Sequence, residues 1–507
     1  MFSKKQKRKF FKQVHLWSGR KCLKRKIEDN MIKINKNLKI IVLVFLAAII
    51  FTFLPLPFTL GQKIMIAIAF TAASFWITEA LPISVTAFLV ILLQIIFGVH
   101  SVEEGLAFIA TPVNTLLLAG FVIAAALKKY DLDRRIGLQF IALMGEKTEN
   151  LIFGVFLATA FLSMWISNTA ATAIMIPIGI GMIKKVIDDP KGTNLGKAMI
   201  IGIAFSANLG GMGTPVGTPP VPITIGFLEE EGISVSFADW IIRAVPVLLL
   251  SLPIVWKVMT TIYEPEVKRI KGGTEQVKKE LAEMGDLTKR QKHVLILFGI
   301  AVTLWLLDTI NDLIIRNLLG VNILPLPDGW LYIASLVISF MFILPGLGVV
   351  KWEEARDEIG WGVFVLVGGG LALGSGLEKT GVIQLIVEHM EVFLADANLL
   401  LIVGTIAFVT AFSITLFSSL TATSSTFVPV SITLAYSLGL EPLLLAPVAG
   451  LAACMAFLLP ANTPPNALSY KTGYFKTYEM TKAGLFATIM CAAALTLIVM
   501  IYWTPIL

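Results

Sequence analysis

Charge is scarce in this chain of 507 residues, because Asp, Glu, Lys and Arg make up only 15% of it. Soluble domains carry about 25% charged residues, whereas hydrophobic residues here reach 56% and the mean hydropathy is +0.82. These values exclude a soluble globular protein. Roughly ten to twelve apolar segments occur, many of them about 20 residues long, the length that crosses a hydrocarbon core. The composition predicts an all-α polytopic membrane protein.

Cysteine and histidine are also rare, with three and four residues. Neither type shows a metal-ligand spacing, and Cys454 and Cys491 lie in apolar runs where passive core positions are expected. The chain has no HExxH, no paired intramembrane aspartates and no Ser/His pair at matched depth, so a membrane-embedded enzyme has little support. We expect no cofactor apart from a bound sodium ion.

Positive charge is concentrated at the start of the chain, where residues 1–39 hold 14 Lys and Arg residues against two acids. The whole chain has a net charge of +7, so the remaining body is slightly acidic and needs no nucleic-acid partner. By the positive-inside rule, residues 1–38 form a cytoplasmic tail before a first transmembrane segment at 39–61. We expect a multi-pass protein of the plasma or inner membrane, surrounded by the lipid bilayer.

A second polar segment, 264–292, predicts a cytoplasmic linker from its Lys and Arg content, between a first repeat at 62–263 and a second at 293–507. Three pairs of segments match between these halves: 116–132 with 365–382, Ser167 and Pro177 with Ser419 and Pro429, and GTPP at 217–220 with NTPP at 462–465. Because the pairs keep one order at offsets of 250, 252 and 245 residues, they indicate an internal duplication. In transporters such repeats are often inverted.

Each half interrupts its apolar pattern in three ways. The expected interruptions are a re-entrant hairpin with a charged tip at 116–135 and 365–382, a span split by Ser and Thr at 165–177 and 417–429, and a span split by Gly and Pro at 210–220 and 460–466. A Thr-Pro-Pro run cannot continue a helix, and at bilayer depth its freed backbone groups must face protein or a polar cavity.

Such breaks have a chemistry suited to small ions. Half-helix ends with neighbouring Ser, Asn and Thr side chains can hold an anion without a buried Lys or Arg, and carbonyl and Asn oxygens suit sodium. The structural alternative is that Ser and Thr bond the backbone or a neighbouring helix, at about 0.6 kcal/mol each. Glu79, in WITEALPISVTAF, is a candidate intramembrane acid, although the following Leu81 and Pro82 favour a helix-end position at the membrane interface.

At these residues the sequence resembles the divalent anion/sodium symporter family, which includes the dicarboxylate carriers called INDY. The resemblance covers about residues 60–505 and is carried by five segments: WITEALPISVTA (76–87), SNT (167–169), GTPP (217–220), GGGLALGSGLEKTG (368–381) and LPANTPPNA (459–467). It implies a homodimer with a scaffold domain, a mobile transport domain, two re-entrant hairpins and elevator-type movement of a small dianionic carboxylate.

The resemblance also implies site residues, because in the family two Ser-Asn-Thr motifs each hold one substrate carboxylate beside the two Pro-rich breaks. The expected substrate-binding residues are Ser167, Asn168, Thr169, Ser419, Leu420, Thr421, Thr218, Pro219, Thr463 and Pro464. The expected sodium ligands are Ser163, Asn168 and Gly217 at a first site and Thr415, Ser418 and Asn462 at a second.

One position departs from the family pattern, because the second motif reads Ser-Leu-Thr, with Leu420 in place of asparagine. Leucine offers no oxygen to sodium, so the second cation site should be weakened or lost. The Ser-Leu-Thr-Ala sequence is similar to the motif of members that exchange anions without sodium. The main hypothesis is therefore an exchanger for the succinate, malate, fumarate and 2-oxoglutarate class. The alternatives are a sodium-coupled dicarboxylate, citrate or sulfate symporter and, with less support, a channel.

Overall fold

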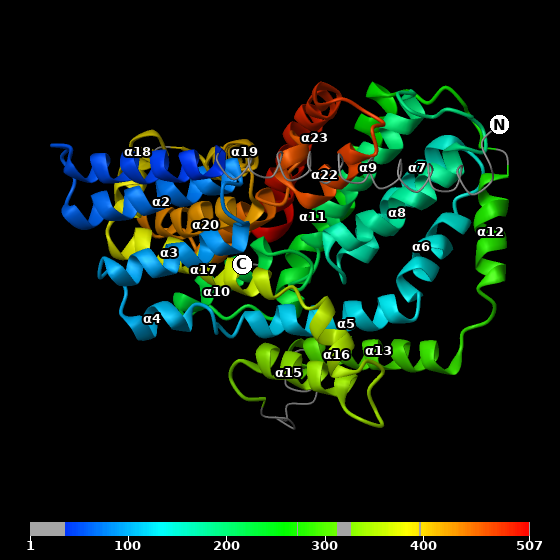
Figure 1. Ribbon diagram of the computed structural model, residues 1–507, viewed down its shortest axis with the longest axis horizontal. Coiled ribbons are helices and arrows are strands. Elements are labelled where there is room, and N and C mark those ends of the chain that lie inside the picture. The colour runs from blue at the N-terminus through cyan, green and yellow to red at the C-terminus, as the bar shows by residue number, and fades with distance from the viewer. Residues whose placement is uncertain (1–35, 271, 312–325, 395–396, 506–507) are drawn as a thin grey trace, which may run out of the picture.

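The computed structural model describes residues 36–270, 272–311, 326–394 and 397–505. In these ranges the protein is helical (Figure 1), with one isolated β-bridge between Lys147 and Arg269. Seven described helices are long and apolar enough to cross a membrane, and five further apolar helices have 10–17 residues. The predicted all-α polytopic architecture is confirmed for the described ranges. Most of the basic tail predicted at 1–38 lies outside them.

The first described helix runs from Lys36 to Phe53 and buries few of its side chains. It ends before the predicted boundary at residue 61, because Pro55 and Pro57 follow it. Thr59 then caps the next helix by accepting a hydrogen bond from the Gln62 N–H at 3.3 Å. The prediction of a first span at 39–61 is therefore wrong at its C-terminal boundary.

The other helices form two series that match in order. The first series is α2 (Leu60–Thr78), α3 (Ile83–Ile96), α4 (Val102–Ala107), α5 (Asn114–Lys129), α6 (Leu132–Ala142), α7 (Thr148–Ser163), α8 (Asn168–Ile183), α9 (Asn194–Gly211), α10 (Pro220–Glu230) and α11 (Phe237–Ile262). The second series is α13 (Lys289–Ile310), α15 (Trp330–Ile343), α16 (Trp352–Glu358), α17 (Trp361–Lys379), α18 (Val382–Leu394), α19 (Leu399–Phe417), α20 (Leu420–Ser437), α21 (Pro442–Ala452), α22 (Pro464–Lys471) and α23 (Thr477–Ile498).

Corresponding helices in the two series have similar features. For example, α3 and α15 each have 14 residues, and α8 and α20 each begin after a capping serine and contain one proline. Between the series, α12 (Gly273–Glu283) lies within the predicted linker and packs on α6, where Arg134 pairs with Glu280 at 3.0 Å. This correspondence supports the internal duplication predicted from the sequence.

The first hairpin lies at the Ser-Asn-Thr cluster. Phe156 of α7, which precedes the tip, lies against Gly202 of α9, and Gly179 of α8, which follows the tip, lies against the adjacent Ile203. Because residues on both sides of the tip reach the same level of α9, α7 and α8 run side by side in opposite directions. The tip was predicted as a break within one span, and the structure makes it the turn of a hairpin.

The second hairpin is formed by α19 and α20, where the rings of Phe417 and Phe427 meet at 6.4 Å across the turn. The helix hairpins lie at the Ser/Thr clusters, so their predicted placement at 116–135 and 365–382 is wrong. There, α5 and α17 are continuous to Lys129 and Lys379, and the remaining charges of the first segment lie at the start of α6. The glycines of α17 allow close helix packing instead of a break. A Cβ on Gly369 would lie 2.6 Å from the Ala87 carbonyl oxygen of α3.

The predicted Gly/Pro breaks are present in both series. α9 ends at Gly211 and α10 begins at Pro220, while α21 is followed by a short 3₁₀ turn, η2 (Pro460–Asn462), before α22. The halves pack reciprocally: α10 contacts α20 and α21, and α22 contacts α8 and α9. Each split helix therefore reaches the hairpin of the other series.

The two split helices run in opposite directions between the ends of the protein. At the end that carries α12, the Gly192 N–H before α9 donates to the Tyr474 carbonyl after α22 at 3.2 Å. The Tyr263 hydroxyl after α11 donates to the Glu479 carbonyl of α23 at 2.7 Å. The chain thus leaves this end through α9 and returns to it through α22 (Figure 1).

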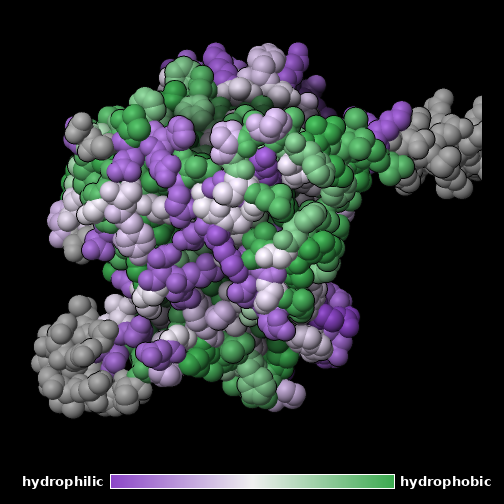
Figure 2. All heavy atoms as spheres, turned by 90° about the vertical axis from the view of Figure 1, so that its left-hand side faces the viewer, coloured by the Kyte–Doolittle hydropathy of each residue, from purple (hydrophilic) through white to green (hydrophobic). Residues whose placement is uncertain are grey.

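The opposite end carries α4 and α18 (Figure 1). Figure 2 views this end, and hydrophilic side chains gather across its middle, while hydrophobic side chains cover much of its right-hand margin. Exposed large hydrophobic residues are numerous on α2, α3 and α19. A polar end with apolar flanks is the pattern expected of a protein whose sides contact lipid.

Candidate anion-binding site

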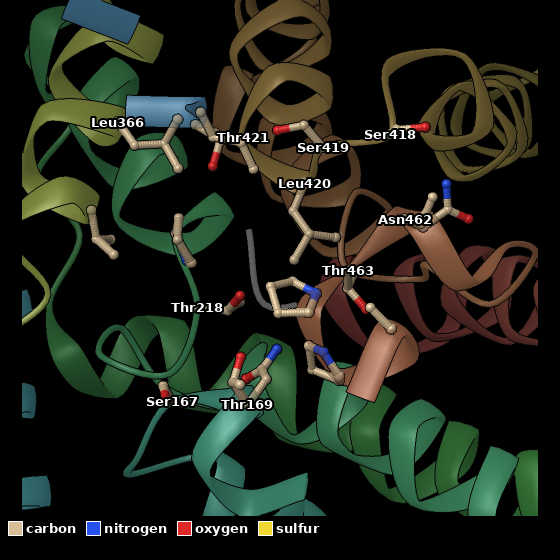
Figure 3. A pocket seen from close by; sticks show the side chains of 18 of the residues that line it. Ser167, Thr169, Thr218, Leu366, Ser418, Ser419, Leu420, Thr421, Asn462 and Thr463 are labelled. Atoms are coloured by element: carbon tan, nitrogen blue, oxygen red, sulfur yellow. The ribbon is translucent and has the colours of Figure 1, made fainter. Parts of the chain in front are cut away.

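Both Ser/Thr clusters border one cavity of about 440 Å³ (Figure 3). It lies where the two hairpin tips meet the breaks of the split helices, although these segments are far apart in the sequence. All ten predicted substrate-binding residues line it, namely Ser167, Asn168, Thr169, Ser419, Leu420, Thr421, Thr218, Pro219, Thr463 and Pro464. The volume falls in the range of small-molecule sites, about 300–1,000 Å³.

The two hairpin tips share one local geometry. The Ser167 hydroxyl accepts a hydrogen bond from the Ala170 N–H at 3.3 Å and caps α8, and the Ser419 hydroxyl accepts from the Ala422 N–H at 3.3 Å and caps α20. In each helix the first-turn N–H groups before the capped one have no acceptor among the described residues. The tips therefore direct unpaired donors toward the cavity.

The starts of α10 and α22 contribute differently. Pro219 and Pro220, like Pro464 and Pro465, occupy the first positions there and have no N–H to offer. The expectation that these half-helix ends expose N–H groups is therefore wrong for their first residues. The Thr218 side chain projects toward the cavity instead (Figure 3). The available donors at the cavity are thus hydroxyls at the breaks and N–H groups at the hairpin tips.

Electrostatically, the cavity is positive without cationic side chains. Four helices, α8, α10, α20 and α22, begin at its wall, and the unpaired N–H groups that form the positive end of a helix dipole are those of α8 and α20. No Lys, Arg or His is among the described residues that line the cavity, and Glu79 is the one acid. Such a site can bind a small anion through dipoles and neutral donors.

The predicted first sodium ligands form a compact group of oxygens. The Ser163 hydroxyl lies 2.7 Å from the Asn168 Oδ1 and 2.7 Å from the Ala207 carbonyl oxygen, and Ser163 is fully buried behind the cavity wall. Neutral hydroxyl, amide and carbonyl oxygens are suitable ligands for a hard cation. The residues at this position therefore fit a sodium ion, with Asn168 shared between the cation and the anion cavity.

Two glycines create the space for this group. A Cβ on Gly211 would lie 2.3 Å from the Asn168 Oδ1, and a Cβ on Gly217 would lie 2.3 Å from the Gly211 carbonyl oxygen. Any larger residue at either position must displace its neighbour. Gly217, predicted as a sodium ligand, can offer only its backbone, whereas Gly211 was not predicted and could have been found from the GGMGTPVGTPP run.

The predicted second sodium site fits a cation poorly. Leu420 points into the cavity and carries no oxygen (Figure 3). The Asn462 amide nitrogen donates to the Ile414 carbonyl at 3.1 Å, and the Asn462 Oδ1 accepts from the Leu459 N–H at 2.8 Å. The Thr415 hydroxyl donates to the Phe412 carbonyl of its own helix at 2.6 Å. Ser418 lines the cavity, but these residues together do not form an oxygen cluster like the first.

A buried asparagine pair, which sequence reasoning missed, joins the two series beside the cavity. Asn208 of α9 donates through its Nδ2 to the Ala456 carbonyl at 3.1 Å and to the Asn466 Oδ1 at 3.0 Å. Asn466 donates in turn to the carbonyls of Ala456 and Leu459. These bonds satisfy backbone carbonyls freed by the second break, as buried polar groups require. The sequence offered one signal for this pair: Asn208 and Asn466 are isolated asparagines in apolar segments.

Two hairpin tips and two broken helices around one cavity define a membrane transporter, in which such breaks form the binding site. A family model described as "Sodium:sulfate symporter transmembrane region" matches residues 34–507. The chain therefore belongs to this family, the divalent anion/sodium symporters indicated by its motifs, and it is a transporter and not an enzyme.

Curated relatives extend over nearly the whole chain. It is 32% identical over 468 residues to the sodium-dependent dicarboxylate transporter SdcS of Staphylococcus saprophyticus, covering 89% of this chain and 88% of that protein. It is 32% identical over 472 residues to SdcS of Staphylococcus aureus strain USA300, covering 90% and 89%. Among solved structures, the YdaH transporter of Alcanivorax borkumensis is similar in fold, with a TM-score of 0.50, 13% identity and coverage of 78% and 85%.

Proposed function

We propose that the protein is a secondary-active transporter of small dicarboxylates, of the succinate, malate, fumarate and 2-oxoglutarate class, coupled to sodium. The observation that carries this proposal is the single cavity bordered by two tips with the same capping geometry. Two matched half-sites suit the two carboxylates of one small molecule. The names of the SdcS relatives support the same substrate class.

In this proposal each hairpin tip holds one carboxylate. The first-turn N–H groups of α8 and α20 donate to it, and the hydroxyls of Thr169 and Thr421 lie in the same turns. Hydrogen bonds from neutral donors orient the dianion without pairing it to a buried Arg or Lys. Removing one partner of such a buried charge pair is costly, so neutral donors favour release of the substrate after transport.

Sodium coupling is proposed through the first cation site. Ser163, Asn168 and the Ala207 carbonyl provide its oxygens, and Asn168 borders the anion cavity as well. A cation there would add positive charge next to the bound carboxylate, so the two ions would bind cooperatively. The relatives' names favour this sodium-coupled reading over the exchange that Leu420 suggested first.

Sodium-independent exchange is the second candidate function. Leu420 offers no oxygen to the second site, where the family pattern has an asparagine. A second sodium ion would therefore have one ligand fewer. A carrier with one weakened cation site can lose its sodium requirement altogether, which is the outcome that favours exchange.

We further propose the movement implied by the family resemblance. The two series would be inverted repeats, consistent with the opposite directions of the split helices and their reciprocal packing. The hairpins and split helices would form the transport domain, and α2, α3, α5, α13, α15 and α17 the scaffold of a homodimer. Light scattering of the purified protein tests the dimer.

The test of the proposed function uses the purified full chain in liposomes. Uptake of labelled succinate is measured with and without an inward sodium gradient, and with and without succinate inside. Uptake that needs sodium and ignores internal succinate supports the symporter. Uptake that ignores sodium but needs internal succinate supports exchange instead, and competition by unlabelled citrate and sulfate tests the alternative anions. No uptake of dicarboxylate under any condition would contradict the proposal.

A further inference from the structure

Glu79 has an unusual position in the cavity wall. Among the twenty described residues that line the cavity it is the only ionisable one, and its side chain is exposed there. It comes from the turn between α2 and α3, whereas the neutral donors come from the hairpin tips and breaks. The lining residue closest to Glu79 in the sequence is Ile83, at the start of α3. The wall that faces the anion thus includes one carboxylate, although the proposed substrate is itself negative.

Local structure does not explain a glutamate at this position. Residue 79 ends α2 with φ 49° and ψ 31°, the left-handed region that suits glycine or asparagine. A carboxylate at the C-terminal end of a helix also meets the negative end of the helix dipole. Both effects make glutamate less stable here than glycine or asparagine would be. A locally unfavourable residue beside a binding cavity motivates the hypothesis of a role in binding.

The turn that carries Glu79 is held in place. The Trp76 indole N–H donates to the Ile83 carbonyl across the turn at 3.2 Å, and Trp76 is only 2% exposed. The Asn37 side chain donates to the Ala80 carbonyl at 3.3 Å. Within the described part of the chain, the Glu79 carboxylate itself has no hydrogen bond or ion pair. Its charge is therefore available to act on what enters the cavity.

We propose that Glu79 is a specificity-determining residue that disfavours anions carrying a third negative charge, a deepening that rests on the proposed dicarboxylate function. The helix N-termini at the two hairpin tips offer unpaired N–H donors to two carboxylates, one at each tip. A third carboxylate, as in citrate, has no third hairpin tip to bind and adds repulsion from Glu79. Two unit charges about 10 Å apart, roughly the diameter of a sphere with the volume of this cavity, repel at an effective dielectric constant of about 20 by an amount equal to about 15-fold in binding.

The test compares a tricarboxylate with a dicarboxylate on the full-length protein in liposomes. Inhibition constants of unlabelled citrate and unlabelled succinate are measured against uptake of labelled succinate, above and below the pH of the last ionisation of citrate. The variants are Glu79→Gln and Glu79→Asn, which remove the charge, and Glu79→Asp, which keeps it. Glu79→Asn suits the left-handed turn and so guards against misfolding. Glu103→Gln, on exposed α4 outside the cavity, is the matched control.

The expected result is a change in the ratio of the two constants. Above the last ionisation of citrate, Glu79→Gln and Glu79→Asn should strengthen citrate relative to succinate by about tenfold, and citrate inhibition should become less dependent on pH. Glu79→Asp and Glu103→Gln should keep the wild-type ratio. An unchanged ratio in both neutral variants, or an equal change for both anions, would overturn the inference while leaving the proposed function intact. Absence of succinate transport by the wild type would overturn both.

Discussion

Gly211→Ala adds one methyl group at the most crowded point beside the first cation site. The new Cβ would lie 2.3 Å from the Asn168 Oδ1 and 2.9 Å from its Nδ2, whereas ordinary contacts begin at 3.4 Å. Asn168 must therefore move by about 1 Å, or α9 must separate from the hairpin tip. Either response displaces the oxygen that would bind sodium and the N-terminal turn of α8 that borders the anion cavity.

The size of the effect follows from overpacking. One extra methyl group in a tightly packed site costs about 1–3 kcal/mol, which corresponds to about 5- to 150-fold in affinity if the strain is relieved by losing the bound ions. We expect Gly211→Ala to raise the sodium concentration for half-maximal uptake, and the KM for succinate, by about tenfold or more. Both should rise together, because Asn168 borders both sites.

The assay is sodium-dependent uptake of labelled succinate into liposomes, normalised to folded protein by gel filtration. Gly181→Ala is the matched control, because Gly181 lies on α8 as well but has no atom within 4 Å of an added Cβ. It should transport as the wild type does. If Gly211→Ala shows the same sodium response and KM as Gly181→Ala, the reasoning that places a cation at Asn168 is refuted.

Three further predictions concern the second site, the tips and the linker. Leu420→Asn should make the sodium response steeper, because it restores an oxygen ligand, and a lower Hill coefficient than that of the wild type would contradict this. Ser167→Ala and Ser419→Ala should each weaken succinate binding by about fivefold. Each removes a helix cap worth about 1 kcal/mol at one half-site, so the two factors should be similar. Calorimetric titration checks whether they match. Burial would raise the pKa of Glu266, but the N–H groups that begin α9 donate to its carboxylate and hold the pKa below its ordinary value. The stability that this contact provides is present at neutral pH and is lost as the pH falls through the lowered pKa. Glu266→Gln should therefore lower the free energy of unfolding by about 0.5 kcal/mol near pH 7 and by progressively less in acid. Thermal unfolding measured against pH checks this.

Much of the site could be predicted from the sequence because short motifs supply its polar side chains and its helix breaks. Thr-Pro-Pro must break a helix wherever it stands, and its repetition beside Ser/Thr clusters indicated two half-sites before any coordinates. In the structure Ser167, Thr218, Ser419 and Thr463, from four separate segments, line one cavity. Cys491, in an apolar run, is fully buried as expected.

The hairpins could not be placed from the same patterns. A charged end on a Gly-rich segment suggested a turn at 365–382, but the glycines of α17 pack against α3 and leave the helix intact. Whether α7 and α8 continue in line or fold back depends on contacts with α9, which lies later in the chain. The Asn208–Asn466 pair likewise joins residues 258 positions apart, and no local pattern encodes such a contact.

The central claim is that both hairpin tips hold the same small dianion. A cryo-EM structure of the full-length protein in nanodiscs, with sodium and saturating succinate, tests it most directly. We predict one succinate in the cavity, with one carboxylate within hydrogen-bond distance of the Ser167–Thr169 turn and the other within hydrogen-bond distance of the Ser419–Thr421 turn. Succinate bound to one tip alone, or outside this cavity, would contradict the account.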